Sequence, residues 1–370
     1  QIQESLCKMV EKASIPMEYR YLGNSGLKVS VIAYGDMLSA DTEENQKRTD
    51  EVVKKCFEVG INYFDTAEAY GNGAHEKLLG RALKACDKKR SEYVVSTKIF
   101  TTDRFNIKPN NIGLSRKHLI EAFKNSLERL QLEYVDVLFC HRPDQTTPME
   151  EVVLTFKDFF ARNQIFYWAT SEWSAAEIAH ARMLCEKYGV PPPIAEQVQY
   201  NMVHRERFEV EYANLFDRHK MGSTVWGSLS GGLLTGKLLE ENFDKTGTRY
   251  EIPMLNSSYK IDKSLDPKNV EKTKKMFAEL GEIAKELGVT MAELAIAWVL
   301  RNNNVTTAIL GMTKASYVES ALNAVQVYSK LTKEHEVRLD KILGTMPNFG
   351  IDWRKFAEKP PRRHKFYAVQ

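Results

Sequence analysis

The chain has 370 residues, of which 43% are apolar and 27% are charged, a composition typical of a globular protein. Its 52 basic and 49 acidic side chains nearly cancel to a formal charge of +3, so the charge gives no indication of a nucleic-acid partner. A membrane-spanning helix needs about 20 consecutive apolar residues. Because the sequence has no such run, we expect no direct membrane insertion.

Strand-like and helix-like segments alternate eight times between Tyr19 and Val327. The helix-like segments carry apolar residues at a 3.6-residue period, as residues 48–60 and 115–130 do. Eight successive βα units predict a closed (β/α)8 TIM barrel rather than an open, doubly wound sheet. The expected strands cover residues 29–35, 61–67, 93–99, 135–141, 165–171, 194–200, 223–229 and 306–312.

Helix ends are marked by residues that satisfy the free backbone groups there. Glycines that adopt a left-handed conformation close helices, which predicts helix ends at Gly60, Gly189 and Gly288. Capping boxes, in which Ser or Thr precedes Glu by three residues, predict helix starts at Ser174–Glu177, Thr290–Glu293 and Ser316–Glu319.

Several segments fall outside the eight-fold repeat. Residues 19–30 predict a short hairpin that plugs the lower end of the barrel, and two extra helices are expected over residues 291–303 and 332–346. Residues 231–269 show little periodicity, and a loop of that length is typical of a functional lid.

The two ends of the chain differ in composition from the barrel. The residues from Ile351 onward are basic and contain a pair of prolines, which fits either a solvated arm or an interaction peptide. We therefore expect an N-terminal extension (1–16), a barrel (17–346) and a C-terminal tail (347–370). The first twelve residues lack the apolar core of a secretory signal, which favours a cytoplasmic protein.

The five cysteines are scattered and include no C-x-x-C pair. A disulfide framework and a zinc site are therefore disfavoured, and a reducing interior is expected. Cys140 adjoins His141, but strand alternation points the two side chains to opposite sides. We expect Cys140 to pack in the core.

Four polar residues, Asp65, Tyr70, Lys98 and His141, lie at or just beyond the ends of three consecutive expected strands. Parallel strands of a barrel end on one face, so these residues can converge there. A phenol has an ordinary pKa of about 10, and a nearby ammonium lowers it, which eases proton transfer near neutrality. Asp65 would hold Lys98, and His141 would direct the substrate oxygen. The set predicts carbonyl or alcohol chemistry without a metal.

Each of these residues alone also fits a structural role. Asp65 could cap a helix, Tyr70 could lie at the rim, Lys98 could be a surface charge and His141 a core histidine. Their joint position at consecutive strand ends favours the chemical role. A metal-dependent hydrolase is disfavoured, because Lys98 between the other two strand-end residues would repel a cation.

The sequence resembles the aldo-keto reductases in F-D-T-A-E-x-Y-G (Phe64 to Gly71) and S-T-K-I (Ser96 to Ile99). Residues 113–144, followed by PMEE, WATSEWS, EQVQYNM and LAIAWVLRN, are similar to the branch of voltage-gated potassium channel β subunits. The resemblance covers about Glu18 to Met346. It implies a catalytic tetrad of Asp65, Tyr70, Lys98 and His141, with Tyr70 as the proton donor. Animal channel β subunits carry asparagine at the position of His141, so this tetrad is the reductase version.

The resemblance also implies NADPH bound across the barrel mouth. Ser171, Glu172 and Gln197 would hold the nicotinamide amide, and Trp226 would stack on the ring or simply pack in the core. Glycines allow the backbone to approach a pyrophosphate, and backbone N–H groups bind it. The other implied cofactor residues are Met37, Gly227, Ser228, Leu229, Ser230, Gly231, Lys237, Arg249, Gly311, Thr313 and Tyr317.

Two functions remain open from the sequence. The first is an NADPH-dependent reductase of small aldehydes or ketones. The second is a structural or regulatory subunit of a channel or another larger assembly, which would bind its protein partner through the surface or the tail. Gly227 and Ser228 replace the Ser-Pro of related chains, and Asp36 adds a carboxylate near the cofactor. Both departures favour the structural or regulatory role. The channel branch forms tetramers, so the resemblance also implies a homo-tetramer.

Overall fold

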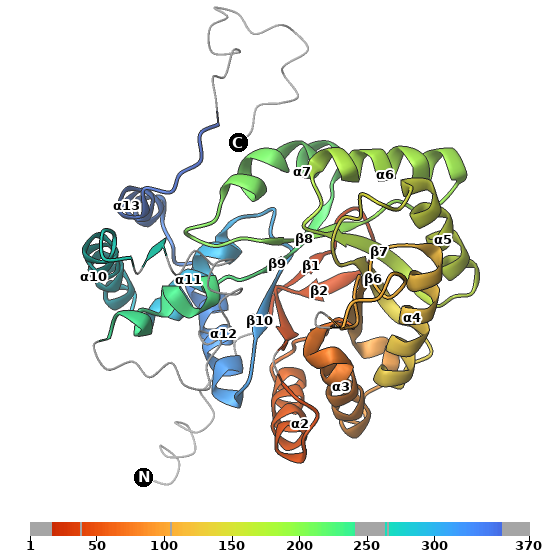
Figure 1. Ribbon diagram of the computed structural model, residues 1–370. Coiled ribbons are helices and arrows are strands. Elements are labelled where there is room, and N and C mark those ends of the chain that lie inside the picture. The colour runs from red at the N-terminus through yellow and green to blue at the C-terminus, as the bar shows by residue number, and fades with distance from the viewer. Residues whose placement is uncertain (1–16, 38, 104–105, 241–262, 265, 350–370) are drawn as a thin grey trace, which may run out of the picture.

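The computed structural model describes residues 17–37, 39–103, 106–240, 263–264 and 266–349. Eight parallel strands close into a barrel in the order β10-β3-β4-β5-β6-β7-β8-β9, and helices surround it (Figure 1). The predicted (β/α)8 TIM barrel is confirmed. The barrel strands are β3 (Ile32–Gly35), β4 (Tyr63–Asp65), β5 (Val94–Ile99), β6 (Val135–Cys140), β7 (Ile165–Ser171), β8 (Ala195–Gln199), β9 (Gly222–Trp226) and β10 (Thr307–Gly311).

The longer helices form the outer layer of the molecule. They are α2 (Glu43–Glu58), α3 (Ala74–Ala85), α4 (Arg116–Leu130), α5 (Met149–Ala161), α6 (Ala175–Tyr188), α7 (Ala213–His219), α10 (Val270–Glu286), α11 (Met291–Arg301), α12 (Ala315–Tyr328) and α13 (Lys333–Leu343). Short helical turns connect some strands and helices: η1 (Tyr70–Gly73), η2 (Arg90–Glu92), the π-helical η3 (Arg207–Glu211), η4 (Ser230–Thr235) and η5 (Lys237–Leu239).

The helix ends largely follow the predicted capping residues. The capping boxes Ser174–Glu177 and Thr290–Glu293 are present at the starts of α6 and α11. Gly60, Gly189 and Gly288 have φ of 85°, 62° and 70° at the ends of α2, α6 and α10, as predicted.

The predicted capping box at Ser316–Glu319 is wrong. Helix α12 already begins at Ala315, and its N-cap residue is Lys314, in an extended conformation and without a side-chain cap. Ser316 therefore lies inside the first turn, where its hydroxyl cannot cap the helix. The predicted sequence pattern is present, but the chain enters the helix two residues earlier than the box requires.

The N-terminal hairpin closes the lower end of the barrel, as predicted. Strands β1 (Tyr19–Tyr21) and β2 (Lys28–Ser30) pair antiparallel. Leu22 and Val29 are fully buried in the cluster that fills the barrel interior. A Cβ on Gly23 would lie 2.3 Å from the carbonyl oxygen of Ile194, beside the start of β8. The close approach of the two backbones therefore requires a glycine there.

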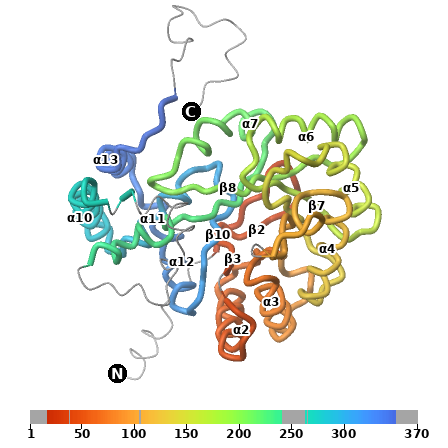
Figure 2. Tube along the Cα trace, viewed as in Figure 1, coloured from red at the N-terminus to blue at the C-terminus, as the bar shows by residue number. Residues whose placement is uncertain are grey.

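The extra helices differ in part from the prediction. Helix α13 packs against α10, away from the barrel, and Figures 1 and 2 show the two side by side. Helix α11 instead lies between β9 and β10 in sequence and packs on β10 and α12, so it belongs to the ring around the barrel. The prediction that residues 291–303 form a helix outside the ring was therefore wrong. The helix that packs with α13 outside the ring is α10. Most of the predicted lid, and the tail from residue 350 onward, lie outside the described residues.

The main core lies between the strands and the helices. Phe156 of α5 stacks on Trp168 of β7 with ring centroids 4.3 Å apart. Cys140 is fully buried in this layer, as predicted, and burial raises the pKa of its thiol well above the usual range. None of the helices in the described part of the chain is long and apolar enough to span a bilayer.

Candidate active site

A buried ion pair lies at the carboxyl ends of β4 and β5. The ammonium of Lys98 donates one hydrogen bond to Oδ2 of Asp65 and another, of 2.7 Å, to the carbonyl oxygen of Thr66. The side chains of Lys98 and Asp65 are 0% and 2% exposed. Charges buried this deeply require a partner and further hydrogen bonds. The barrel supplies both, and it holds the pair out of contact with water.

The second oxygen of Asp65 is held from across the barrel. Its Oδ1 accepts a hydrogen bond of 2.6 Å from Ser96 Oγ and one of 3.3 Å from Gln197 Nε2. Gln197 comes from β8, and its amide nitrogen also lies 3.2 Å from Thr224 Oγ1 of β9. The carboxylate is therefore fixed from several strands, which fixes the ammonium of Lys98 in turn.

Tyr70 and His141 complete the group. Tyr70 begins η1, and its ring centroid lies 4.8 Å from Lys98 Nζ. The ring of His141 stands edge-on to that of Tyr70, with centroids 5.7 Å apart and an interplanar angle of 80°. His141 follows β6 and its backbone N–H donates to Ile99 O at 3.0 Å. The four residues that the sequence singled out thus lie together at one end of the barrel.

The turn that presents Tyr70 depends on a glycine. Gly71 has φ of 57°, in the left-handed region, and a Cβ there would lie 2.7 Å from the carbonyl oxygen of Ser39. Only glycine combines this backbone conformation with such a close approach at no steric cost. The turn is therefore packed tightly against the segment that follows β3.

Glu172 lies at the end of β7 and is bound by other protein groups. Its Oε1 accepts hydrogen bonds from the indole N–H of Trp226 (2.8 Å) and the backbone N–H of Gln199 (2.7 Å). Its Oε2 accepts one of 2.7 Å from Arg207 Nη1. The carboxylate therefore sets the orientation of Trp226. The neighbouring Ser171 Oγ lies 3.2 Å from Nη1 of Arg142.

The loop after β9 has an unusual backbone. Gly227, Ser230, Gly231 and Gly232 have φ of 72°, 48°, 68° and 101°, all in the left-handed region. Ser228 Oγ is buried and has no hydrogen-bond partner among the described residues. A buried hydroxyl without a partner is costly unless something fills its hydrogen-bonding capacity. The loop therefore fits a polar ligand such as the pyrophosphate of a dinucleotide.

The remaining cofactor candidates are spread over neighbouring strand ends. Strand β10 lies between β9 and β3, and Gly311 is at its end. On the β9 side Gly311 has the loop that carries Ser228 and Leu229 as its neighbour. On the β3 side its neighbour is the end of that strand, just before Met37. Thr313 lies just before α12 and Tyr317 lies in its first turn, where the side chain of Tyr317 is 43% exposed. Lys237 begins η5 and is exposed, whereas Arg249 lies outside the described residues.

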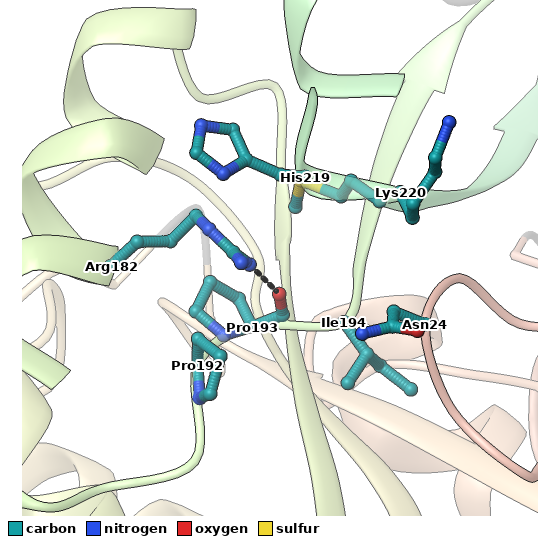
Figure 3. A pocket seen from close by; sticks show the side chains of 8 residues that line it. Asn24, Arg182, Pro192, Pro193, Ile194, His219 and Lys220 are labelled. Atoms are coloured by element: carbon teal, nitrogen blue, oxygen red, sulfur yellow. Dashed lines mark hydrogen bonds between the residues drawn. The ribbon is translucent and has the colours of Figure 1, made fainter. Parts of the chain in front are cut away.

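The described part of the chain has a cavity beside the Glu172 network and another near the amino ends of the strands. One, of about 500 Å³, adjoins the Glu172 network and is lined by Glu172, Gln199, His204, Glu206, Arg207, Val210 and Glu211. The other is small, about 50 Å³, and lies where β8 and β9 begin, at the opposite end from Tyr70. There Arg182 donates to the carbonyl oxygen of Pro193 (Figure 3).

Several residues of the site did not stand out in the sequence. Ser96 could have been found, because it shares a strand face with Lys98. Thr66 and Thr224 resemble ordinary strand residues, and Arg207 reaches Glu172 across 35 positions from a π-helical turn, which no local pattern predicts. Among the described residues, no group of three or more His, Cys, Asp or Glu side chains is arranged to bind a metal.

A buried acid behind this network predicts a pH-dependent stability. Glu196 of β8 is 1% exposed and accepts hydrogen bonds from Thr170 Oγ1 (2.5 Å) and the backbone N–H of Trp173 (3.2 Å). Burial raises the pKa of Glu196 well above 4.5, and the charge of Glu172 raises it further. The folded state thus holds this proton more tightly than the unfolded chain. The free energy of unfolding should fall as the pH rises from about 4.5 towards the raised pKa.

We expect Glu196→Gln, which resembles the protonated acid, to remove this loss. Urea denaturation should give similar free energies of unfolding for the variant and the wild type near pH 4.5. Towards pH 8 the variant should become increasingly the more stable of the two. Glu121→Gln, on the exposed face of α4, is the matched control and should show no such trend. If the free energies of unfolding of Glu196→Gln and the wild type differ by the same amount at every pH, the prediction is contradicted.

The chain has this fold and this arrangement of active-site residues, and it belongs to the aldo/keto reductase family. The sequence model of that family matches residues 31–343. The family is one of oxidoreductases that generally bind NAD(P)H and act on carbonyl compounds.

Three similar proteins all carry the name of one branch of the family, the voltage-gated potassium channel β subunits. The chain is 40% identical over 328 residues to an Arabidopsis thaliana protein named "Probable voltage-gated potassium channel subunit beta", covering 88% of this chain and 95% of the relative. A protein of Oryza sativa subsp. japonica with the same name is 38% identical over 331 residues, covering 90% and 98%. A Schizosaccharomyces pombe relative, likewise named as a voltage-gated potassium channel subunit beta, is 39% identical over 330 residues, covering 89% and 94%.

Proposed function

We propose that this protein reduces aldehydes or ketones to alcohols with NADPH, and that Tyr70 is the proton donor. The observation that supports this most directly is the position of the Tyr70 ring, whose centroid lies 4.8 Å from the buried ammonium of Lys98 and 5.7 Å from the ring centroid of His141. In the reaction, the carbonyl carbon gains a hydride and its oxygen gains a proton. Bound NADPH would supply the hydride, so the side chains need to supply the proton and orient the oxygen.

Each of the four residues has a distinct role in this proposal. Tyr70 gives its hydroxyl proton to the carbonyl oxygen and becomes a phenolate. The buried ammonium of Lys98 stabilises that negative charge. Asp65 holds the ammonium in place, and His141 hydrogen-bonds the substrate oxygen so that it faces Tyr70.

For the cofactor, we propose the residues at the neighbouring strand ends. Gln197 and Ser171 would bind the nicotinamide amide, and Glu172 would act mainly by orienting Trp226 against the ring. The buried hydroxyl of Ser228, which has no hydrogen-bond partner in the described part of the chain, supports a pyrophosphate in the loop from Gly227 to Gly231. The other proposed contacts are Met37, Leu229, Ser230, Lys237, Arg249, Gly311, Thr313 and Tyr317.

A titration with NADPH tests the proposal. Binding should quench the intrinsic tryptophan fluorescence, since Trp226 would stack on the nicotinamide, and added aldehyde should then consume NADPH. Trp226→Phe keeps an aromatic ring but loses the hydrogen bond to Glu172, and we expect it to bind NADPH about tenfold more weakly. A wild-type protein that binds no NADPH at millimolar concentration would contradict the proposed function.

A second candidate is a regulatory subunit of a channel or another larger assembly. The names of the plant and fission-yeast relatives favour it. NADPH binding without turnover of any carbonyl compound would favour this role over catalysis. In either case we propose that the protein is a cytoplasmic homo-tetramer. Each chain would have a barrel of residues 17–346, preceded by an N-terminal extension and followed by a C-terminal tail. The tail would be available to bind a partner.

A further inference from the structure

A buried histidine closes the loop that carries Tyr70. His75 lies in the first turn of α3, five residues after Tyr70, and is 0% exposed. Its Nδ1 lies 2.9 Å from Oγ1 of Thr66, the residue that directly follows Asp65. Its Nε2 lies 3.3 Å from the hydroxyl of Tyr34. The contact between His75 and Thr66 therefore joins the two ends of the segment that has Tyr70 near its middle.

Thr66 connects this histidine to the ion pair. The carbonyl oxygen of Thr66 accepts the 2.7 Å hydrogen bond from Lys98 Nζ, and its backbone N–H donates to Ser96 O at 3.0 Å. The residue is fully buried, so none of these groups can exchange its partner for water. The position of the Lys98 ammonium thus depends on the position of Thr66, and Thr66 is held from outside the strand by His75.

The protonation state of His75 suits this role. Burial lowers its pKa, the charge of Lys98 lowers it further, and the carboxylates of Asp36 and Asp65 partly oppose the change. The ring is therefore neutral near pH 7 and offers one donor and one acceptor nitrogen. These match its two hydroxyl partners, Thr66 and Tyr34. A neutral ring also avoids placing a second positive charge near Lys98.

We propose that His75 is a positioning residue for Tyr70, acting through Thr66 to keep the Lys98 ammonium beside the phenol ring. This inference rests on the proposed function and adds a residue to it. His75 itself is buried behind the site and bonded to two protein hydroxyls, so its effect on the reaction passes through Thr66 and Lys98. Small displacements of a catalytic group have large effects on rate, which makes such a support measurable.

Three variants separate this role from simple stability. Thr66→Val keeps the shape of the side chain but removes the hydroxyl that His75 contacts. His75→Leu removes both ring nitrogens, and His75→Asn keeps a polar atom close to the position of Nδ1. The readout is the rate of alcohol oxidation with NADP⁺ across pH, together with kcat and KM at each pH.

We expect Thr66→Val and His75→Leu to lower kcat about tenfold, with KM for NADP⁺ changed less than about twofold. The pH of half-maximal rate should move up by about 0.5–1, because a displaced ammonium stabilises the negative oxygen less. His75→Asn should recover most of the wild-type profile. Thr155→Val is the matched control, since Thr155 is also fully buried and its hydroxyl bonds to Glu151 O at 2.7 Å on α5, outside this network.

The outcomes distinguish this inference from the proposed function. If the wild type turns over and the pH of half-maximal rate is unchanged in folded Thr66→Val and His75→Leu, the positioning role is wrong and the proposed function stands. The same follows if Thr155→Val shifts the profile as much as Thr66→Val does. A wild-type protein with no turnover at any pH would overturn both. Should His75→Leu not fold, Thr66→Val and His75→Asn still decide the question.

Discussion

Replacing Tyr70 by phenylalanine should lower kcat for carbonyl reduction by about 10²–10⁴-fold, the usual contribution of a positioned general acid. Phenylalanine keeps the ring beside the Lys98 ammonium and edge-on to His141. Only the hydroxyl that would give its proton to the substrate is lost. The affinity for NADPH and the free energy of unfolding should therefore change little, which fluorescence titration and urea denaturation would measure.

A second tyrosine of similar surroundings is a matched control. Tyr188, the last residue of α6, has the ammonium of Lys187 at 4.9 Å from its ring centroid. Helix α6 ends at the opposite end of the barrel from Tyr70, because each helix runs back antiparallel to the strands. Tyr188→Phe should leave kcat unchanged. Comparable losses in both variants, or none in Tyr70→Phe, would contradict the assignment of the proton donor.

Replacing Lys98 by methionine should have the largest effect on stability. The side chain is 0% exposed, and its removal leaves the Asp65 carboxylate buried without its cation. Breaking one side of a buried pair costs about 3–5 kcal/mol, much more than the pair contributes net. We expect the free energy of unfolding, measured in urea at pH 7, to fall by about that amount, and carbonyl reduction to be lost.

Two further variants test whether the uncompensated charge of Asp65 causes the loss of stability. Adding Asp65→Asn to Lys98→Met removes the uncompensated charge and should recover part of the lost stability but none of the activity. Lys117→Met breaks an exposed pair with Glu121, whose side chains are 56% and 59% exposed. Exposed pairs contribute little, so this control should change the free energy of unfolding by less than about 1 kcal/mol. A Lys98→Met protein as stable as the control would show that the ion pair is not buried as described.

The barrel and the convergence of the four polar residues could be predicted from the sequence. Strand periodicity and the common direction of parallel strands are local and topological properties, so Asp65 and Lys98 could be placed together without knowing any contact. The cofactor residues resemble those of a known family, but their roles here remain proposals. The carboxylate of Glu172, for example, is bound by Trp226 and Arg207.

The features that the sequence did not reveal depend on tertiary contacts. Arg207 reaches Glu172, and Thr66 reaches His75, through side-chain positions that only the folded barrel defines. The start of α12 was misplaced because a local capping pattern competes with the path of the chain out of β10. A helix ending at Gly288 was predicted, but its place outside the ring was not, because its partner, α13, lies far along the sequence.

The most direct test of the central claim is the fate of a labelled hydride. Wild-type protein would be mixed with NADPH deuterated at the transferring position of nicotinamide C4 and a small aldehyde, and the alcohol would be analysed by mass spectrometry. We predict one deuterium on the carbinol carbon of each product molecule, and no product with Tyr70→Phe on the same timescale. Alcohol without deuterium, or equal labelled product from wild type and Tyr70→Phe, would contradict it.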